Sequence, residues 1–268
     1  MKYFQKLELS PELARYRSQI EATIQPYIKI RERANNHLNW WQSKFGELPY
    51  FPQEMDYPQT TTGEYLSLLA QINFAEVPNL AGFPEAGILQ FYIFAEGGYG
   101  KDYLEPRKQD WFRVFYILEP TYDEAKLVTN FSFLPEIDYV NNFPISRTCA
   151  LDFSYELAPL SIRDDRFKDS IGEDLEQLLS NNPHLWNEYD DKFSKGSKIG
   201  GYPHFTQDDP RPHFIKNKEP FILLLQIDSS RYNDNICWGD CGVGNFFIQK
   251  SALKRLDFDD VFYTWDCS

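Results

Sequence analysis

The sequence has little of the chemistry on which common enzymes depend. It contains only 4 Cys and 4 His among 268 residues. The P-loop, the dinucleotide-binding fingerprint, the Gly-x-Ser-x-Gly elbow and the His-Glu-x-x-His zinc motif are all absent from it. These absences exclude the enzyme classes that carry such motifs. The sequence therefore favours a non-enzymatic role without excluding an enzyme, and we expect no cofactor.

Long apolar runs are also missing. No stretch approaches the roughly 18 consecutive apolar residues that a membrane-spanning helix needs. Residues 1–6 have no apolar core of the kind that a secretory signal peptide carries. We therefore expect a cytoplasmic protein that does not enter a membrane.

The four cysteines are too sparse for a disulfide framework. Cys237 and Cys241 have a loose zinc-ligand spacing, and a histidine or another cysteine could complete the set. A second closely spaced pair is missing, however, and the corresponding segment of the first half carries Gly82 and Ala86. Small residues thus suffice at these positions, so we expect free thiols and no metal.

Positive charge is scarce relative to negative charge. The net charge is -13 and the sequence pI is about 4.8. Such a chain would repel a phosphate backbone, which makes nucleic acid a poor partner. High solubility is the ordinary explanation for this acidity, and attraction to a basic protein partner is the functional alternative. We expect a monomer or a weak dimer.

Aromatic residues, in contrast, are abundant, and three sequence blocks recur in order. Phe, Tyr and Trp make up 17% of the chain, which favours a sheet-rich core. The recurring blocks are 43–53 and 197–207, 68–73 and 223–228, and 87–93 and 242–248. They define repeat 1, residues 43–118, and repeat 2, residues 197–266. We expect two pseudo-equivalent halves that share one core in a single domain, residues 1–268.

The pattern of apolar residues predicts a mainly β (α+β) fold, an internally duplicated antiparallel sheet or roll. Strands are expected at 65–72, 88–94 and 112–118 of repeat 1, and at 221–227, 243–248 and 261–265 of repeat 2. Outside the repeats, residues 27–33 alternate as a strand does, and residues 126–133 suggest a further strand.

Two helical regions complete this prediction. Ser10 and Pro11 are typical of a helix start, which predicts an N-terminal helix over residues 10–25. A helical insertion is expected over residues 166–194, where Ser170 and Glu173 form a capping-box pattern.

The repeated blocks carry a resemblance to a known family. Together with Gln207-x-Asp209-Pro210-Arg211 and the Trp238 loop, they resemble the bacterial YwqG family from about residue 43 onward. This resemblance implies a mainly β, roll-like fold and says little about function. Some members of that family lie near toxin-immunity loci, which suggests an immunity or interaction role. The chain departs from the family pattern at Glu47 and Cys241.

Two glutamines are predicted to be structural. Gln71 and Gln226 occupy corresponding positions inside apolar strands, where a buried amide needs hydrogen-bond partners. Their recurrence favours a role in holding the repeated Ser-Lys-x-Gly loops over a role in lining a ligand site.

The candidate binding residues lie mainly where the two repeats diverge. His204 stands where repeat 1 has Tyr50, and Asp208, Asp209 and Arg211 replace other residues of repeat 1. A histidine beside carboxylates and an arginine could act as acid, base or anion clamp. The competing interpretation is an exposed, salt-bridged turn, which predicts that His204→Ala and Arg211→Ala barely change stability.

Trp238 and Asp240 are further candidates, because they lie in a glycine-rich loop. A comparable aromatic residue, acid and glycine recur in repeat 1, which favours turn capping. Two hypotheses for function result. The first is a binding or interaction protein, of immunity type, with a basic partner. The alternative is a small-ligand-binding protein or hydrolase-like enzyme that uses a cleft between the repeats.

Overall fold

The computed structural model describes residues 7–34, 38–46, 48–96, 98–138, 142–214, 219–230 and 235–268, so that Glu47 lies outside it. The strands are β1 (Gln25–Arg33), β2 (Lys44–Phe45), β3 (Ser67–Asn73), β4 (Ile88–Ile93), β5 (Phe112–Ile117), β6 (Cys149–Ala158), β7 (Lys198–Gly200), β8 (Phe221–Asp228), β9 (Val243–Gln249) and β10 (Val261–Asp266). These strands form one sheet in the order β10-β9-β8-β7-β1-β6-β2-β3-β4-β5, in which the paired neighbours are antiparallel. The predicted mainly β class is confirmed.

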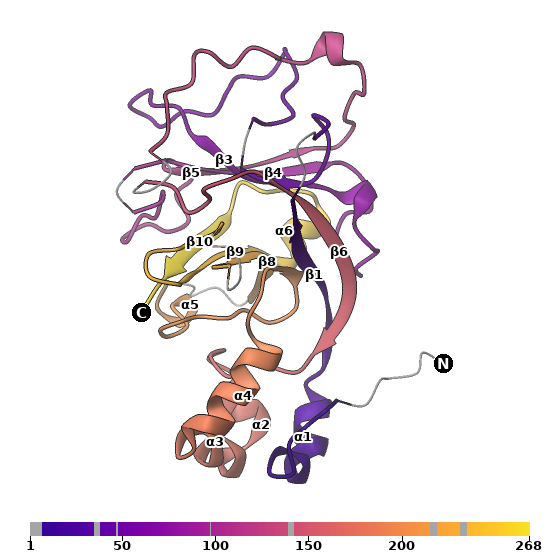
Figure 1. The fold of residues 1–268 in the computed structure, drawn as a ribbon, viewed down its shortest axis with the longest axis vertical. Helices are drawn as coiled ribbons and strands as arrows, with labels where there is room; N and C mark the ends of the chain where they lie inside the picture. The colour runs from indigo at the N-terminus through magenta and orange to yellow at the C-terminus, as the bar shows by residue number, and fades with distance from the viewer. Residues whose placement is uncertain are drawn as a thin grey trace.

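Two long strands form the spine of the sheet. β1 pairs with β6 from Gln25 opposite Ala158 to Arg33 opposite Ala150. The strands of repeat 1 follow on the β6 side, and those of repeat 2 follow on the β1 side, in the same order. Both halves also contain a register shift at a corresponding place, between Leu68 and Ala70 in β3 and between 223 and 225 in β8. The two halves therefore have corresponding topologies (Figure 1).

The halves fold toward each other across a common core. The ring of Phe91 in β4 lies 4.8 Å from that of Phe246 in β9, and the ring of Phe112 in β5 lies 5.2 Å from that of Tyr263 in β10. One buried apolar cluster includes residues of both halves. Burial of these rings at a shared interface is favourable because it removes apolar surface of both halves from water.

The helices form a separate lobe beyond the ends of β1 and β6 (Figure 1). They are the 3₁₀ turn η1 (Leu13–Tyr16), α1 (Arg17–Ala22), α2 (Phe167–Ile171), α3 (Glu173–Ser180) and α4 (Pro183–Phe193). Their apolar faces share a second core, in which Leu13, Ile20 and Tyr189 are fully buried. Within the described ranges, no helix combines the length and apolar character that crossing a bilayer requires.

The predicted helix starts are wrong in detail. The N-terminal helical segment spans residues 13–22, which is shorter than predicted, and the Ser10 hydroxyl has no hydrogen-bond partner in the described structure. Ser170 lies inside α2, and α3 begins after Gly172, whose φ is 96°. A left-handed glycine separates these helices, so the pattern from Ser170 to Glu173 does not form a capping box.

The segment at residues 126–133 is not a strand. Glu124–Lys126 is a 3₁₀ turn, and Leu127 forms only an isolated bridge with Pro52. The aromatic residues that suggested a strand serve packing instead, since Phe131 and Phe133 contact the ring of Tyr57. Three further elements outside the sheet and the lobe are η2 (Phe74–Glu76), α5 (Arg211–Phe214) and α6 (Lys250–Lys254).

A buried amide holds the loop before each half-sheet. In repeat 2, the Gln226 side chain accepts a hydrogen bond from the backbone N–H of His204 at 2.7 Å and donates to the carbonyl of Gly196 at 2.7 Å. Asn245 of the neighbouring strand donates to the His204 carbonyl at 2.8 Å. Both backbone groups of His204 are thus satisfied by side chains of the sheet, as burial requires.

The same arrangement occurs in repeat 1. Gln71 accepts a hydrogen bond from the N–H of Tyr50 and donates to the carbonyls of Trp40 and Gln42, each at 2.8 Å. Gln90 donates to the Tyr50 carbonyl. The structural role of Gln71 and Gln226 stays a prediction, and hydrogen bonds of this kind are what such a role requires.

Gln71→Ala and Gln226→Ala should each lower the free energy of unfolding by about 1–3 kcal/mol, because each leaves several buried backbone groups without a partner. Urea unfolding of each variant measures this loss. Gln177→Ala is the matched control, since this side chain is exposed on α3. Equal stabilities for all three variants would contradict the structural role.

Candidate functional site

His204 lies inside the protein and faces the helical lobe. Its side chain is 3% exposed, and Nδ1 lies 3.2 Å from Oδ1 of Asp190 in α4. Burial by itself would raise the pKa of Asp190, but the His204 imidazole and Lys195 lower it, which keeps the carboxylate charged. The two groups form an ion pair whenever His204 is protonated. This pair attaches α4 to repeat 2.

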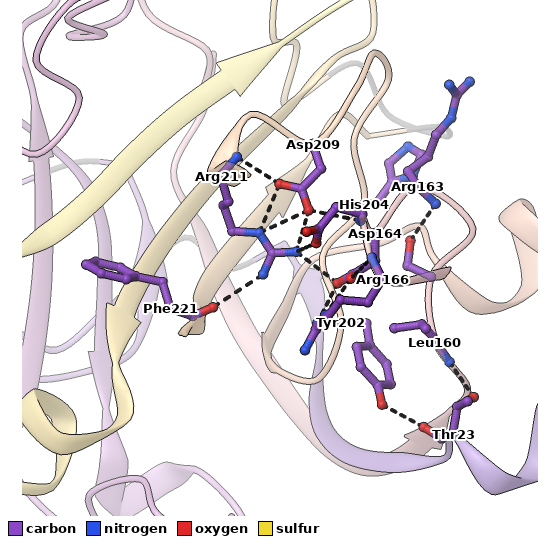
Figure 2. Close-up of polar contacts among 12 residues, drawn as sticks. Thr23, Leu160, Arg163, Asp164, Arg166, Tyr202, His204, Asp209, Arg211 and Phe221 are labelled. Carbon is purple, nitrogen blue, oxygen red and sulfur yellow. Dashed lines mark hydrogen bonds and ion pairs between the residues drawn. The ribbon is translucent and has the colours of Figure 1, made fainter. Parts of the chain in front are cut away.

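Arg211 forms the centre of a buried ion-pair cluster (Figure 2). Its Nε donates to Asp209 Oδ1 at 2.9 Å, and its Nη2 donates to Asp164 Oδ2 at 2.9 Å. Nη1 donates to the carbonyl of Phe221 at 3.3 Å. Arg211 is only 8% exposed and Asp209 only 7%. The interpretation as an exposed turn is therefore wrong, because these charges are paired in the interior.

Asp164 also receives a second arginine. Nε and Nη2 of Arg166 both donate to its carboxylate at 2.6 Å. Burial opposes ionisation of Asp164, yet Arg166 and Arg211 together hold its pKa below the ordinary value. Its neighbour Asp165 behaves differently, because burial and the charges of Asp209 and Asp164 raise its pKa to about 6. The cluster thus joins the segment before α2 to the loop before α5.

Asp164, Asp165 and Asp209 are the one group in the described part of the chain that brings three such side chains within metal-ligand distance of one another. Arg211 and Arg166 already hold two of these carboxylates by direct hydrogen bonds. The geometry is therefore that of a neutralised ion-pair cluster, and a cation would have to displace the arginines.

The other candidate residues lie elsewhere. Trp238 is fully buried, and an added Cβ at Gly244 would come within 2.4 Å of its ring. Asp240 is exposed and accepts a hydrogen bond from the N–H of Ser268 at 3.0 Å. Asp208 is exposed. The structure brings Asp209 and Arg211 together, but not the six predicted residues as one set, and their binding role stays a prediction.

At the positions where the two repeats differ, the side chains contact different segments that lie over the sheet. Tyr50 stands in place of His204, and its hydroxyl accepts a hydrogen bond from the N–H of Thr121 at 2.7 Å. Tyr57 stands in place of Arg211, and its ring contacts that of Phe131. Residues 119–137 thus cover repeat 1 where the helical lobe covers repeat 2. The side chains at positions 50 and 57 therefore contact residues 119–137, whereas those at positions 204 and 211 contact α4 and the segment before α2.

Two adjoining cavities open on repeat 1, beneath residues 133–137. Their volumes are about 470 Å³ and about 420 Å³, and Ser67, Pro135, Glu136 and Ile137 line both of them. We call them together the aromatic groove. The sequence did not predict this groove, because residues 133–137 have no counterpart in repeat 2 and carry no recognisable motif.

These features define a class of proteins in which two corresponding half-sheets share one antiparallel sheet and carry a helical lobe. The chain belongs to the family described as a domain of unknown function (DUF1963), whose model matches residues 43–267. No curated protein matches the sequence. The matched region includes both repeats and the insertion between them.

Arg211→Ala should lower the free energy of unfolding by about 3–5 kcal/mol, because it leaves the Asp164 and Asp209 carboxylates buried with fewer partners. This reverses the small effect expected from the sequence. Arg255→Ala is the control, since its ion pair with Asp257 is exposed and contributes about 1 kcal/mol or less. Urea unfolding that finds equal losses for both variants would contradict the buried cluster.

Lys198 is a buried cation next to the same loop. Its side chain is 2% exposed, and Nζ donates to the carbonyls of Ser194 and Tyr202. Burial lowers the pKa of Lys198 to about 8.

Between pH 8 and pH 10.5, the unfolded chain keeps a proton on Lys198 that the folded chain has released. The free energy of unfolding should therefore rise with pH across this window, by about 3 kcal/mol in total from this group. Urea unfolding of the wild type and of Lys198→Met at several pH values isolates the effect. The difference in free energy of unfolding between the wild type and Lys198→Met should change from pH 8 to pH 10.5. A constant difference would contradict the lowered pKa of Lys198.

Proposed function

We propose that this protein is a YwqG-like cytoplasmic binding protein whose aromatic groove takes a basic segment of another protein. The observation that carries the proposal is the lining of the groove. It combines aromatic rings with the carboxylates of Glu64, Glu96 and Glu136, and among the described residues no Lys, Arg or His lines it. Apolar walls with acidic edges complement lysine or arginine side chains next to apolar ones.

The rings of the groove are held in place before any partner binds. The Tyr57 ring lies 5.8 Å from that of Tyr65 and 5.4 Å from that of Phe133, and Tyr65 and Phe133 are 5.1 Å apart. Phe133 is nevertheless 42% exposed. A fixed but accessible aromatic surface suits binding, because little side-chain entropy is lost on association.

Electrostatics supports the same partner. The hydroxyls of Thr60 and Thr62 donate to Glu64 and lower its pKa, so this carboxylate is charged in neutral solution. The net charge of -13 adds a long-range attraction that speeds encounter with a basic protein. A basic toxin bound by its immunity protein is a partner of this chemistry, and such binding needs only a monomer or weak dimer.

The hydrolase-like alternative has less support. The six residues suggested for it do not lie together, and Arg211 and Asp209 are already paired with each other. His204 faces Asp190 in the interior. A hydrolytic site needs a nucleophile and a base that both reach a cavity, and this geometry does not favour one.

The proposal is tested with a short fluorescent peptide of alternating lysine and leucine, whose binding is followed by anisotropy. We expect binding that weakens with added salt. Phe133→Ala should weaken it about tenfold, because Phe133 provides accessible ring surface in the groove. Glu136→Lys should weaken it further at low salt.

Matched controls separate groove binding from general attraction to an acidic protein. Phe214→Ala removes a similarly exposed ring outside the groove, and Glu12→Lys makes the same charge change elsewhere. Both should bind like the wild type. If a glutamate–leucine peptide binds equally well, or if the groove variants match their controls, the proposed function is wrong.

A further inference from the structure

A third cavity lies between the two repeats. Its volume is about 250 Å³, which suits a small ligand rather than a protein segment. Leu80 and Phe83 of repeat 1 form one wall, and Phe221 of repeat 2 forms another. Gly200 brings these walls together, since a Cβ there would lie 2.8 Å from Leu80. We call this space the seam cavity.

The charged side chains of the described residues that line the seam cavity are all basic, although two of them are paired with the carboxylates of Asp164 and Asp209. Three cationic side chains line it, those of Arg166, Arg211 and Lys250. Within the described ranges, no Asp or Glu side chain lines it. The chain has a net charge of -13, so an average part of its surface carries more acidic than basic side chains. The lining of this cavity departs from that average.

The three cations differ in what they can offer a ligand. Arg211 is held by Asp209, Asp164 and the Phe221 carbonyl, so it forms a fixed wall. Arg166 uses Nε and Nη2 on Asp164, and in the described structure its Nη1 makes no hydrogen bond.

Lys250, at the start of α6, is exposed and lines the cavity, and its charge also helps to lower the pKa of the nearby Glu219 carboxylate, which does not line the cavity. Arg166 and Lys250 thus provide the free donors, and Arg211 adds rigidity.

The seam cavity and one of the two cavities of the aromatic groove share corresponding lining positions. Arg211 corresponds to Tyr57, and Leu223 corresponds to Leu68, and each of the four lines its own cavity. One scaffold position thus has an aromatic hydroxyl on one side of the molecule and a guanidinium on the other. Corresponding strands therefore line one cavity that favours a cationic ligand and another that favours an anionic ligand.

From this geometry we propose that the seam cavity binds a small organic anion, a carboxylate or a phosphate ester with an apolar body. The anionic group meets Lys250 and Nη1 of Arg166, and the apolar body contacts Phe83 and Phe221. Among the described residues, no Ser, Thr, Cys, His, Asp or Glu side chain lines the cavity, which favours binding over a reaction. This inference does not depend on the aromatic groove.

Phenyl phosphate, benzoate and the neutral analogue benzyl alcohol test the site by isothermal titration calorimetry and ligand-observed NMR on the full chain. We expect saturable binding of at least one anion and none of the alcohol. Lys250→Gln should weaken that binding about tenfold, the loss of one charge-assisted hydrogen bond. The stronger of the two anions identifies the ligand class.

Lys254→Gln is the matched control, because it makes the same change on the same short helix at an exposed residue that does not line the cavity. It should bind the anion like the wild type. Absence of saturable anion binding, equal binding of benzyl alcohol, or equal loss in the two lysine variants would each overturn the proposal. Peptide binding at the aromatic groove can succeed or fail independently of these outcomes.

Discussion

The satisfaction of buried backbone groups by the side chains of Gln71 and Gln226 is the constraint on which this structure depends. Each amide lies within an apolar strand and binds the loop that leads into its half-sheet. A buried amide without hydrogen-bond partners at this position would destabilise the fold by the cost of removing it from water. This constraint places Tyr50 and His204 at equivalent positions of the two halves. Their side chains differ, and each contacts a different covering segment.

The sequence predicted the parts of the fold that alternate strongly or recur. β3, β4 and β8 were predicted because their apolar runs are fully or largely buried. β6 was missed, since most of its residues after Leu151 are only partly buried or exposed and its pattern has no repeat. β2 and β7 contain two and three residues and were hidden in glycine-rich loops, where pairing depends on distant partners.

Comparison of repeat 1 with repeat 2 identified positions at which the residues differ, but it did not reveal the contacts that those residues make. It identified His204 and Arg211 as divergent, and their contacts show that His204 joins repeat 2 to α4 of the helical lobe and that Arg211 joins it to the segment before α2. Their burial could not be read from the sequence, because Asp164 lies 47 residues away from Arg211. The sequence suggested a cleft between the repeats and named Arg211 for it, but it did not predict the other lining residues of the seam cavity or the aromatic groove, because their walls come from segments that are close only after folding.

The covering segments, and not the sheet, differentiate the two halves. The sheet supplies matched positions such as 57 and 211, and it is held rigid by the amide networks and by contacts such as that of Phe91 with Phe246. Residues 133–137 add Glu136 on one side, whereas the segment before α2 adds Arg166 on the other. Side chains at matched positions can therefore change charge without a change of backbone, provided that each buried charge keeps a partner from its own cover. Arg211 meets that condition through Asp164, which explains why an arginine is tolerated where the other half has a tyrosine.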